Sequence, residues 1–124
     1  MDAIRVKQVI LIRRDLKMRR GKEIAQGSHA SQAFLADVVL NGKTLSAEGQ
    51  TWLTGMHTKV CVQVESEEEL RTLHAKAVEM GLLAHLVVDA GLTEFAGQPT
   101  LTAGAIGPGD ESLINQVTGH LKLY

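Results

Sequence analysis

The chain has 124 residues, of which 44% are hydrophobic and 22% are charged, and this length and balance suit one globular domain spanning residues 1–124. The formal net charge of −1 argues against a surface coated in positive charge, and the single cysteine, Cys61, excludes an internal disulfide and a cysteine-built zinc site. No apolar stretch approaches the roughly 18 residues of a membrane span, and the N-terminus lacks a signal-peptide layout, so we expect a cytoplasmic protein that makes no membrane contact.

The small net charge hides an uneven distribution along the chain. Residues 1–22 hold eight basic and two acidic side chains, a net of +6. Residues 23–124 hold five basic and twelve acidic side chains, a net of −7. A split of this kind favours a polyanionic partner at the N-terminal segment.

The first third of the chain predicts a strand, a basic loop and a helix. Val6–Arg13 is a nearly unbroken apolar run, typical of a strand buried on both faces. Charged residues 14–21 form an irregular loop, and a helix is expected from Lys22 to about Leu40. The residues that recur at helical spacing, and that we expect to face the sheet, are Ile24, Gly27, Ser28, Ser31, Phe34, Leu35 and Val38.

The middle of the chain predicts a loop, a second strand and a second long helix. Residues 41–57 contain several Gly breakers and are expected to form a loop with a short helical piece around Ala47–Leu53. Thr58–Val64 alternates and is β-branched, as in a strand. The residues from Ser66 to Glu69 form a capping box that starts a helix, which Gly81 is placed to end.

The last third predicts two strands, a helix and a short extended tail. Leu83–Val88 and Thr100–Ile106 are the strands, Asp110 caps the final helix, and Leu121–Tyr124 is the tail. The element order predicts an α/β fold, a three-layer α/β/α sandwich. The first three strands are expected to run parallel, and the fourth antiparallel to the third because their connection is too short for a helical crossover.

Open α/β sheets bind ligands beyond the carboxyl ends of their parallel strands, and two segments lie there: residues 14–22 and residues 89–93. The first of them carries a dense group of cations: Arg13, Arg14, Lys17, Arg19, Arg20 and Lys22. Such a group beside a helix N-terminus suits phosphate, although a solvated basic loop is an equally good interpretation. The pattern around Gly21 and Lys22 is not a Walker loop.

Two further groups of polar residues are candidates for chemistry. Lys22, Gln26 and His29 share one face of the first helix, which is either a site or a solvent-facing surface, and His29 is the best-placed group that titrates near neutral pH. Asp89 ends a strand and either holds a Lys, orients water or acts as a base, or closes an ordinary Asx turn. The other histidines show no metal-ligand spacing, so no metal is expected.

Covalent catalysis is not expected. Cys61 lies in mid-strand, a poor place for a nucleophile, and the sequence contains no G-x-S-x-G elbow. If the protein is a hydrolase, an activated water is the expected nucleophile.

Several motifs in order resemble the archaeal and eukaryotic type of peptidyl-tRNA hydrolase. They are the strand KQVILIRRDLKM, the R-R-G-K that follows, A-Q-x-x-H-A at residues 25–30, D-A-G-x-T from residue 89, T-x-T from residue 100, and the ending V-T-G-H-L-K-L-Y. The resemblance implies hydrolysis of the ester between peptide and tRNA, a four-stranded mixed sheet between helices, no cofactor and a homodimer. It implies catalytic roles for Lys17, Asp89, Thr93 and Thr102 and a less secure one for His29, and tRNA binding by Arg14, Arg19, Arg20, Lys22 and Gln26.

The sequence departs from that family pattern beside the expected site. Leu92 stands where a basic residue is usual and Glu94 where a Gln is usual. The loss of a cation and the gain of an anion weaken contact with phosphate. They favour the alternative of a non-catalytic RNA-binding or protein-binding module that keeps the fold, and a small phosphate-ligand sensor is a third candidate. For the hydrolase, we expect Lys17 to pair with Asp89, which positions the water.

Overall fold

The computed structural model describes residues 5–91 and 95–124, and this part of the chain folds into four strands and four helices. In chain order these are β1 (Val6–Arg13), α1 (Arg20–Asn41), α2 (Ala47–Thr54), β2 (Lys59–Val64), α3 (Glu67–Glu79), β3 (Ala84–Asp89), β4 (Thr100–Asp110) and α4 (Glu111–Thr118). The order of elements matches the one predicted from the sequence.

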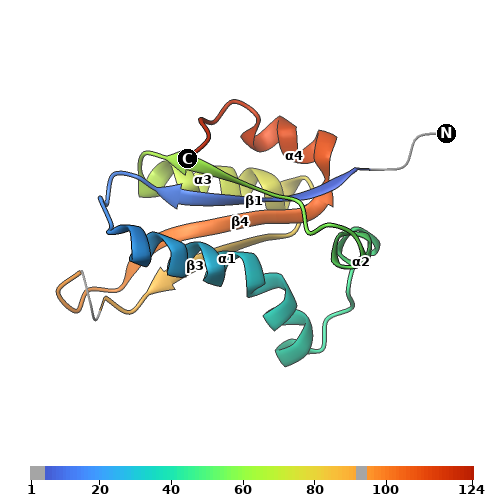
Figure 1. The fold of residues 1–124 in the computed structure, drawn as a ribbon, viewed down its shortest axis with the longest axis horizontal. Helices are drawn as coiled ribbons and strands as arrows, with labels where there is room; N and C mark the ends of the chain where they lie inside the picture. The colour runs from blue at the N-terminus through green and yellow to red at the C-terminus, as the bar shows by residue number, and fades with distance from the viewer. Residues whose placement is uncertain (1–4, 92–94) are drawn as a thin grey trace.

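The four strands form one mixed sheet in the order β2-β1-β4-β3. β1 pairs in parallel with β2, and β4 pairs antiparallel with both β1 and β3. The first three strands therefore share one direction and β4 opposes them, as predicted. Figure 1 shows α3 and α4 over one face of the sheet and α1 over the other, so the predicted three-layer sandwich is confirmed.

Each face of the sheet buries its own apolar cluster, because successive side chains of a strand point to opposite faces. Leu11 of β1 packs with the apolar residues of α3 and α4. Its neighbour Ile12 packs with Met18 and Ala30 on the side of α1. β1 therefore contributes to the core on both faces of the sheet.

The helix α1 turns only part of its predicted face to the sheet, with Phe34 buried and Gly27 beside β1. The residues it buries are Gln26, Ala30 and Phe34. Ile24, predicted to face inward, is 64% exposed. The prediction of the inward face is wrong at this end of the helix because that stripe borders an open groove instead of the core.

The predicted helix caps are present with one change. Ser66 accepts a hydrogen bond from the amide of Glu69 at 3.0 Å, and Asp110 accepts one from the amide of Leu113 at 3.1 Å. The Glu69 carboxylate reaches back to the amide of Glu65 at 2.8 Å, one residue earlier than in a standard capping box.

The C-terminal part of the chain is more extended than predicted. β4 continues to Asp110 because Gly109 pairs with Lys7 of β1. Gly107 has φ +97°, and a Cβ there would lie 2.6 Å from the carbonyl oxygen of Lys7, so this strand needs glycine at that point. The tail forms the predicted short extended piece, with an antiparallel bridge between Leu123 and Val62 of β2.

Candidate active site

Asp89, at the carboxyl end of β3, is the centre of a group of polar contacts. Its Oδ1 atom accepts a hydrogen bond from Lys22 Nζ at 2.9 Å and one from Gln26 Nε2 at 3.3 Å. Its Oδ2 atom accepts one from the amide of Gly91 at 2.8 Å. The hydrogen bond from Lys22, followed by the Gly91 amide, holds the pKa of Asp89 below its ordinary value although burial acts in the opposite direction. The carboxylate is therefore ionised at neutral pH.

Gln26 extends these contacts to β4. Its side chain is buried, and its Oε1 atom accepts a hydrogen bond from the hydroxyl of Thr102, which is itself fully buried. Because the amide nitrogen donates to Asp89 and the amide oxygen accepts from Thr102, both ends of the Gln26 side chain are fixed. We name these four residues, Lys22, Gln26, Asp89 and Thr102, the Asp89 cluster.

The fold brings the Asp89 cluster together from three elements. Lys22 and Gln26 are one turn apart near the start of α1, so their side chains lie on the same side of the helix. Asp89 ends β3, and Thr102 lies near the start of the neighbouring strand β4. An ion pair at this position is largely shielded from water, because the side chains of Lys22 and Asp89 are only 14% and 15% exposed.

The expected pairing of Lys17 with Asp89 is corrected by this geometry, which gives the pairing to Lys22. Lys17 is exposed and lies in the loop before α1 with φ +53°. His29 is also exposed, on the first half of α1. Thr93, together with Leu92 and Glu94, lies outside the described residues.

The cations predicted to bind tRNA surround the N-terminus of α1. Arg19 is the N-cap residue and Arg20 begins the helix, and both are exposed. The side chain of Arg19 makes no capping hydrogen bond to the first turn of the helix. Arg14 lies over the ring of Tyr124, with its guanidinium carbon 4.9 Å from the ring centroid. Backbone amides and cations together make this end of α1 suitable for an anion.

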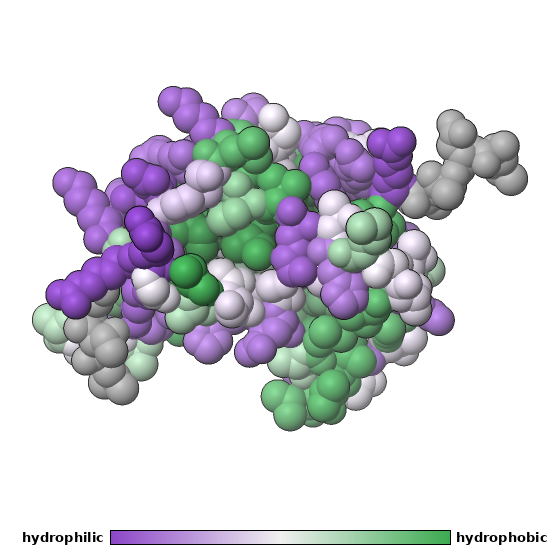
Figure 2. All heavy atoms as spheres, viewed as in Figure 1, coloured by the Kyte–Doolittle hydropathy of each residue, from purple (hydrophilic) through white to green (hydrophobic). Residues whose placement is uncertain are grey.

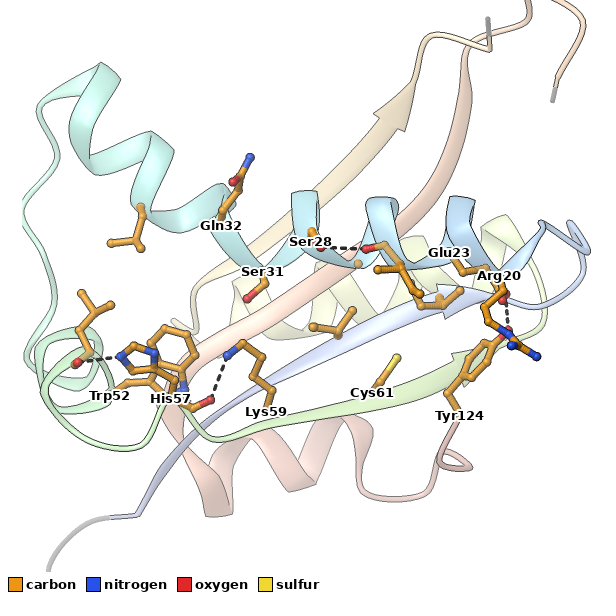
Figure 3. Close-up of a pocket in the computed structure, with 16 residues that line it drawn as sticks. Arg20, Glu23, Ser28, Ser31, Gln32, Trp52, His57, Lys59, Cys61 and Tyr124 are labelled. Atoms are coloured by element: carbon orange, nitrogen blue, oxygen red, sulfur yellow. Dashed lines mark hydrogen bonds between the residues drawn. The ribbon is translucent and has the colours of Figure 1, made fainter. Parts of the chain in front are cut away.

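A groove of about 580 Å³ lies along the other side of α1, between the helix and β2. Figure 3 shows Arg20, Glu23 and Tyr124 at one end and Trp52 and His57 at the other. The floor of the groove is apolar, and in the space-filling view of Figure 2 it is seen as a hydrophobic hollow. The groove is not predicted from the sequence, although the apolar stripe of α1 is the signal that could have indicated it.

Polar contacts lie along the groove as well. The hydroxyl of Tyr124 donates a hydrogen bond to Glu23, and Lys59 lies 4.9 Å from the ring centroid of Trp52. Cys61 lines the groove, and partial desolvation of its thiol, followed by the nearby charge of Glu23, raises its pKa. A raised pKa keeps the thiol protonated at neutral pH, when it is a weak nucleophile.

The described residues offer neither a metal site nor a membrane-spanning helix. Within this part of the chain, no three His, Cys, Asp or Glu side chains gather in a group that could hold a metal ion. None of the described helices has the length and apolar character needed to cross a membrane.

Comparisons with known proteins give a consistent result. The family model described as Peptidyl-tRNA hydrolase PTH2 matches residues 6–124. A peptidyl-tRNA hydrolase of Aeropyrum pernix is 42% identical over 123 residues, which cover 95% of this chain and 95% of that protein. One from Methanocaldococcus jannaschii is 43% identical, covering 95% of this chain and 99% of that protein. The human protein named peptidyl-tRNA hydrolase 2, mitochondrial, is 38% identical, covering 99% of this chain and 66% of that protein.

Proposed function

The chain belongs to the peptidyl-tRNA hydrolase PTH2 family, and from this membership we propose that it hydrolyses the ester bond of peptidyl-tRNA, releasing tRNA and free peptide. The observation that carries the proposal is the family match from residue 6 to residue 124. The Asp89 cluster supports it, since an ionised carboxylate beside an ammonium group is a suitable arrangement for ester hydrolysis by water.

In the proposed mechanism, water attacks the ester directly. The Asp89 carboxylate orients a water molecule, whose oxygen forms a bond to the ester carbonyl carbon. Lys22 stabilises the negative charge that develops on the carbonyl oxygen. The bond to the ribose oxygen then breaks, and the proton lost by the attacking water is transferred to that oxygen, which leaves as a hydroxyl group. No covalent enzyme intermediate forms.

Gln26 and Thr102 act in this mechanism through Asp89. The hydroxyl proton of Thr102 is already donated to Gln26, and Gln26 donates to Asp89, so the pair sets the orientation of the carboxylate. Lys17 and Thr93 remain predicted catalytic residues on the family resemblance. His29 is the predicted donor of the proton to the ribose oxygen.

The basic residues at the N-terminus of α1 are proposed to hold the acceptor end of tRNA. Arg14, Arg19 and Arg20 are exposed there, beside a helix end that already favours anions. Binding through phosphate contacts weakens as salt rises, because neutralised phosphates release their counterions. The concentration of cations at one site explains how a chain of net charge −1 can bind RNA locally.

We also propose that the protein is a cytoplasmic homodimer. A lone cysteine suits a reducing compartment, and fractionation of cells that express the protein would test this location. Large apolar side chains near the C-terminal end of α1 and after α2 are exposed, with values of 78% for Val39, 79% for Leu40 and 93% for Met56. Exposed large apolar side chains are typical of contact surfaces.

A non-catalytic RNA-binding module is the second candidate, and the replacements Leu92 and Glu94 favour it. One experiment separates the two candidates. Purified protein is incubated with N-acetyl-aminoacyl-tRNA, and both binding and the release of free tRNA are measured. Release at catalytic protein concentrations supports the hydrolase. Binding of tRNA without release contradicts the hydrolase and supports the module. A protein that binds nucleotides but neither binds nor releases tRNA would be a phosphate-ligand sensor.

A further inference from the structure

Arg13, the last residue of β1, is a buried cation that the proposed mechanism does not use. Its side chain is 10% exposed. Leu11 and Arg13 point to the same face of the sheet, the face covered by α3, because they are two residues apart in a strand. The guanidinium group therefore lies on the opposite face from Gln26 and Thr102, and it is shielded from any RNA bound at the start of α1.

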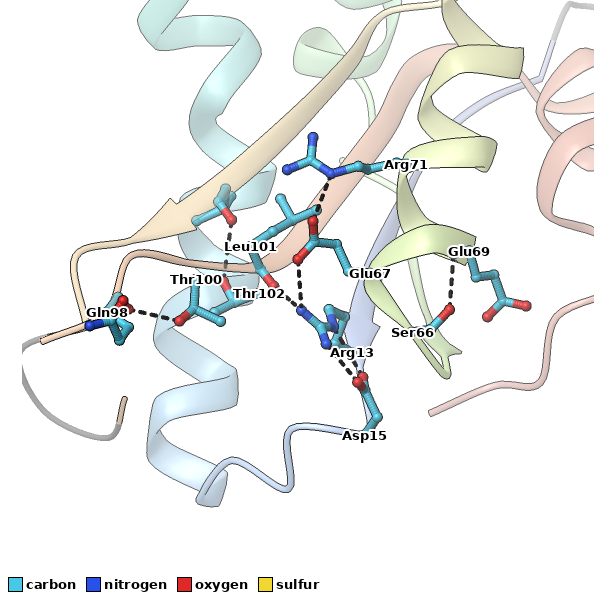
Figure 4. A network of polar contacts seen from close by, with 11 residues as sticks. Arg13, Asp15, Ser66, Glu67, Glu69, Arg71, Gln98, Thr100, Leu101 and Thr102 are labelled. Carbon is cyan, nitrogen blue, oxygen red and sulfur yellow. Dashed lines mark hydrogen bonds and ion pairs between the residues drawn. The ribbon is translucent and has the colours of Figure 1, made fainter. Parts of the chain in front are cut away.

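The guanidinium joins three segments of the chain, as Figure 4 shows. Its Nε and Nη2 atoms donate to the two carboxylate oxygens of Asp15 at 3.0 and 2.6 Å. Its Nη1 atom donates to the carbonyl oxygen of Leu101 at 2.9 Å, one residue before Thr102. Glu67, at the start of α3, lies 3.7 Å from the same nitrogen. A two-point contact between Arg and a carboxylate fixes orientation as well as distance.

We propose that Arg13 and Asp15 are positioning residues that fix the basic loop, residues 14–19, for binding the acceptor end of tRNA, an inference that rests on the proposed function. The contact between their side chains is named the Arg13–Asp15 clasp. It ties the start of the basic loop to β4 beside Thr102, so the cations that bind substrate keep a fixed place relative to the Asp89 cluster.

The rest of the loop is built to keep one conformation. The amide of Arg14 donates to the carbonyl of Val64 at 2.9 Å, and the amide of Lys17 donates to that of Arg14 at 3.1 Å. Met18 is buried in the core on the side of α1. Lys17 has φ +53°, a conformation that a residue other than glycine keeps only when its surroundings hold it. A loop ordered before binding loses less conformational entropy when it binds.

Neutralising Asp15 can either tighten or weaken tRNA binding, and the direction of this change distinguishes the clasp from a simple effect of charge. Asp15 is an acidic residue in a loop that we propose binds phosphate, so charge alone predicts tighter binding when it is neutralised. The clasp predicts weaker binding, because an uncharged Asn loses the ionic two-point contact with Arg13.

The test compares wild-type protein, Asp15→Asn and the control Glu68→Gln, which removes an exposed carboxylate that does not contact Arg13. Dissociation constants for uncharged tRNA, KM and kcat for N-acetyl-aminoacyl-tRNA, and Tm are measured for each. For Asp15→Asn we expect the dissociation constant and KM to rise about tenfold while kcat changes less than about twofold. Glu68→Gln is expected to match wild type. Arg13→Lys, which keeps the charge but not the planar fork, is expected to follow Asp15→Asn.

Unchanged or tighter binding of tRNA by Asp15→Asn, with wild-type Tm, would overturn the clasp. A lower Tm with unchanged KM would also overturn it, since the contact would then serve stability alone. Failure of the proposed function is a separate result: wild-type protein that binds tRNA and releases none of it from the substrate contradicts the hydrolase, while the dissociation constants still decide the clasp.

Discussion

The backbone between Lys17 and Lys22 determines which of these two lysines contacts Asp89. Lys17 and Lys22 are both cations in the predicted basic segment, and residue type and spacing do not separate them. The turn at Lys17, with φ +53°, leaves that side chain exposed, while the first turn of α1 carries Lys22 to 2.9 Å from the carboxylate. Gln26, predicted as a tRNA contact on a helix face that was either a site or solvent-facing, is buried between Asp89 and Thr102.

Lys22 is also the largest cause of the lowered pKa of Asp89. The folded-state pKa of Asp89 lies below its ordinary value of 3.8, so the associated stabilisation is present above that value and is lost as pH falls through the folded-state pKa. We expect Lys22→Gln to raise the pKa of Asp89, since the largest cause of the lowering is removed. Titration of the Asp89 carboxyl carbon by NMR, between about pH 2 and pH 7, measures it. An unchanged pKa in a folded Lys22→Gln protein would contradict the pairing.

At the scale of the elements, the predicted and observed elements agree where local chemistry determines the bounds of a strand or the start of a helix. β1 has its predicted bounds, and the caps at Ser66 and Asp110 accept the expected backbone amides. The predicted and observed elements differ where contacts between residues distant in the sequence determine the structure. Pairing with β1 extends β4 through Gly107 and Gly109, and the open groove leaves the predicted inward stripe of α1 partly uncovered. Neither effect can be read from the spacing of residues within one element.

The cap at Ser66 provides a test of the local part of the fold. Ser66→Ala removes the acceptor for the amide of Glu69, so we expect the free energy of unfolding to fall by about 1 kcal/mol. The matched control is Ser28→Ala, whose hydroxyl bonds within α1 and whose loss is expected to cost less than about 0.5 kcal/mol. Urea denaturation measures both variants. Equal unfolding free energies for the two would show that the Ser66 cap contributes nothing.

At the scale of the whole molecule, the face that holds the groove also carries exposed apolar groups. Figure 2 shows hydrophobic side chains in the hollow beside α1 and again near its C-terminal end. If this surface forms the proposed homodimer, Leu40→Glu places a charge in the contact and is expected to give monomers in sedimentation analysis. Val78→Glu, on α3, is the control and is expected to leave the dimer intact. A wild-type protein that sediments as a monomer would contradict the dimer itself.

The central proposal is that the Asp89 cluster hydrolyses peptidyl-tRNA, and the most direct measurement is a single-turnover assay with saturating protein. N-acetyl-aminoacyl-tRNA is mixed with wild-type protein, Asp89→Asn or the control Glu68→Gln, and release of tRNA is followed over time. We expect Asp89→Asn to bind tRNA yet release it at least about 100-fold more slowly, with Glu68→Gln equal to wild type. Release by Asp89→Asn at the wild-type rate would contradict the assignment of the catalytic centre.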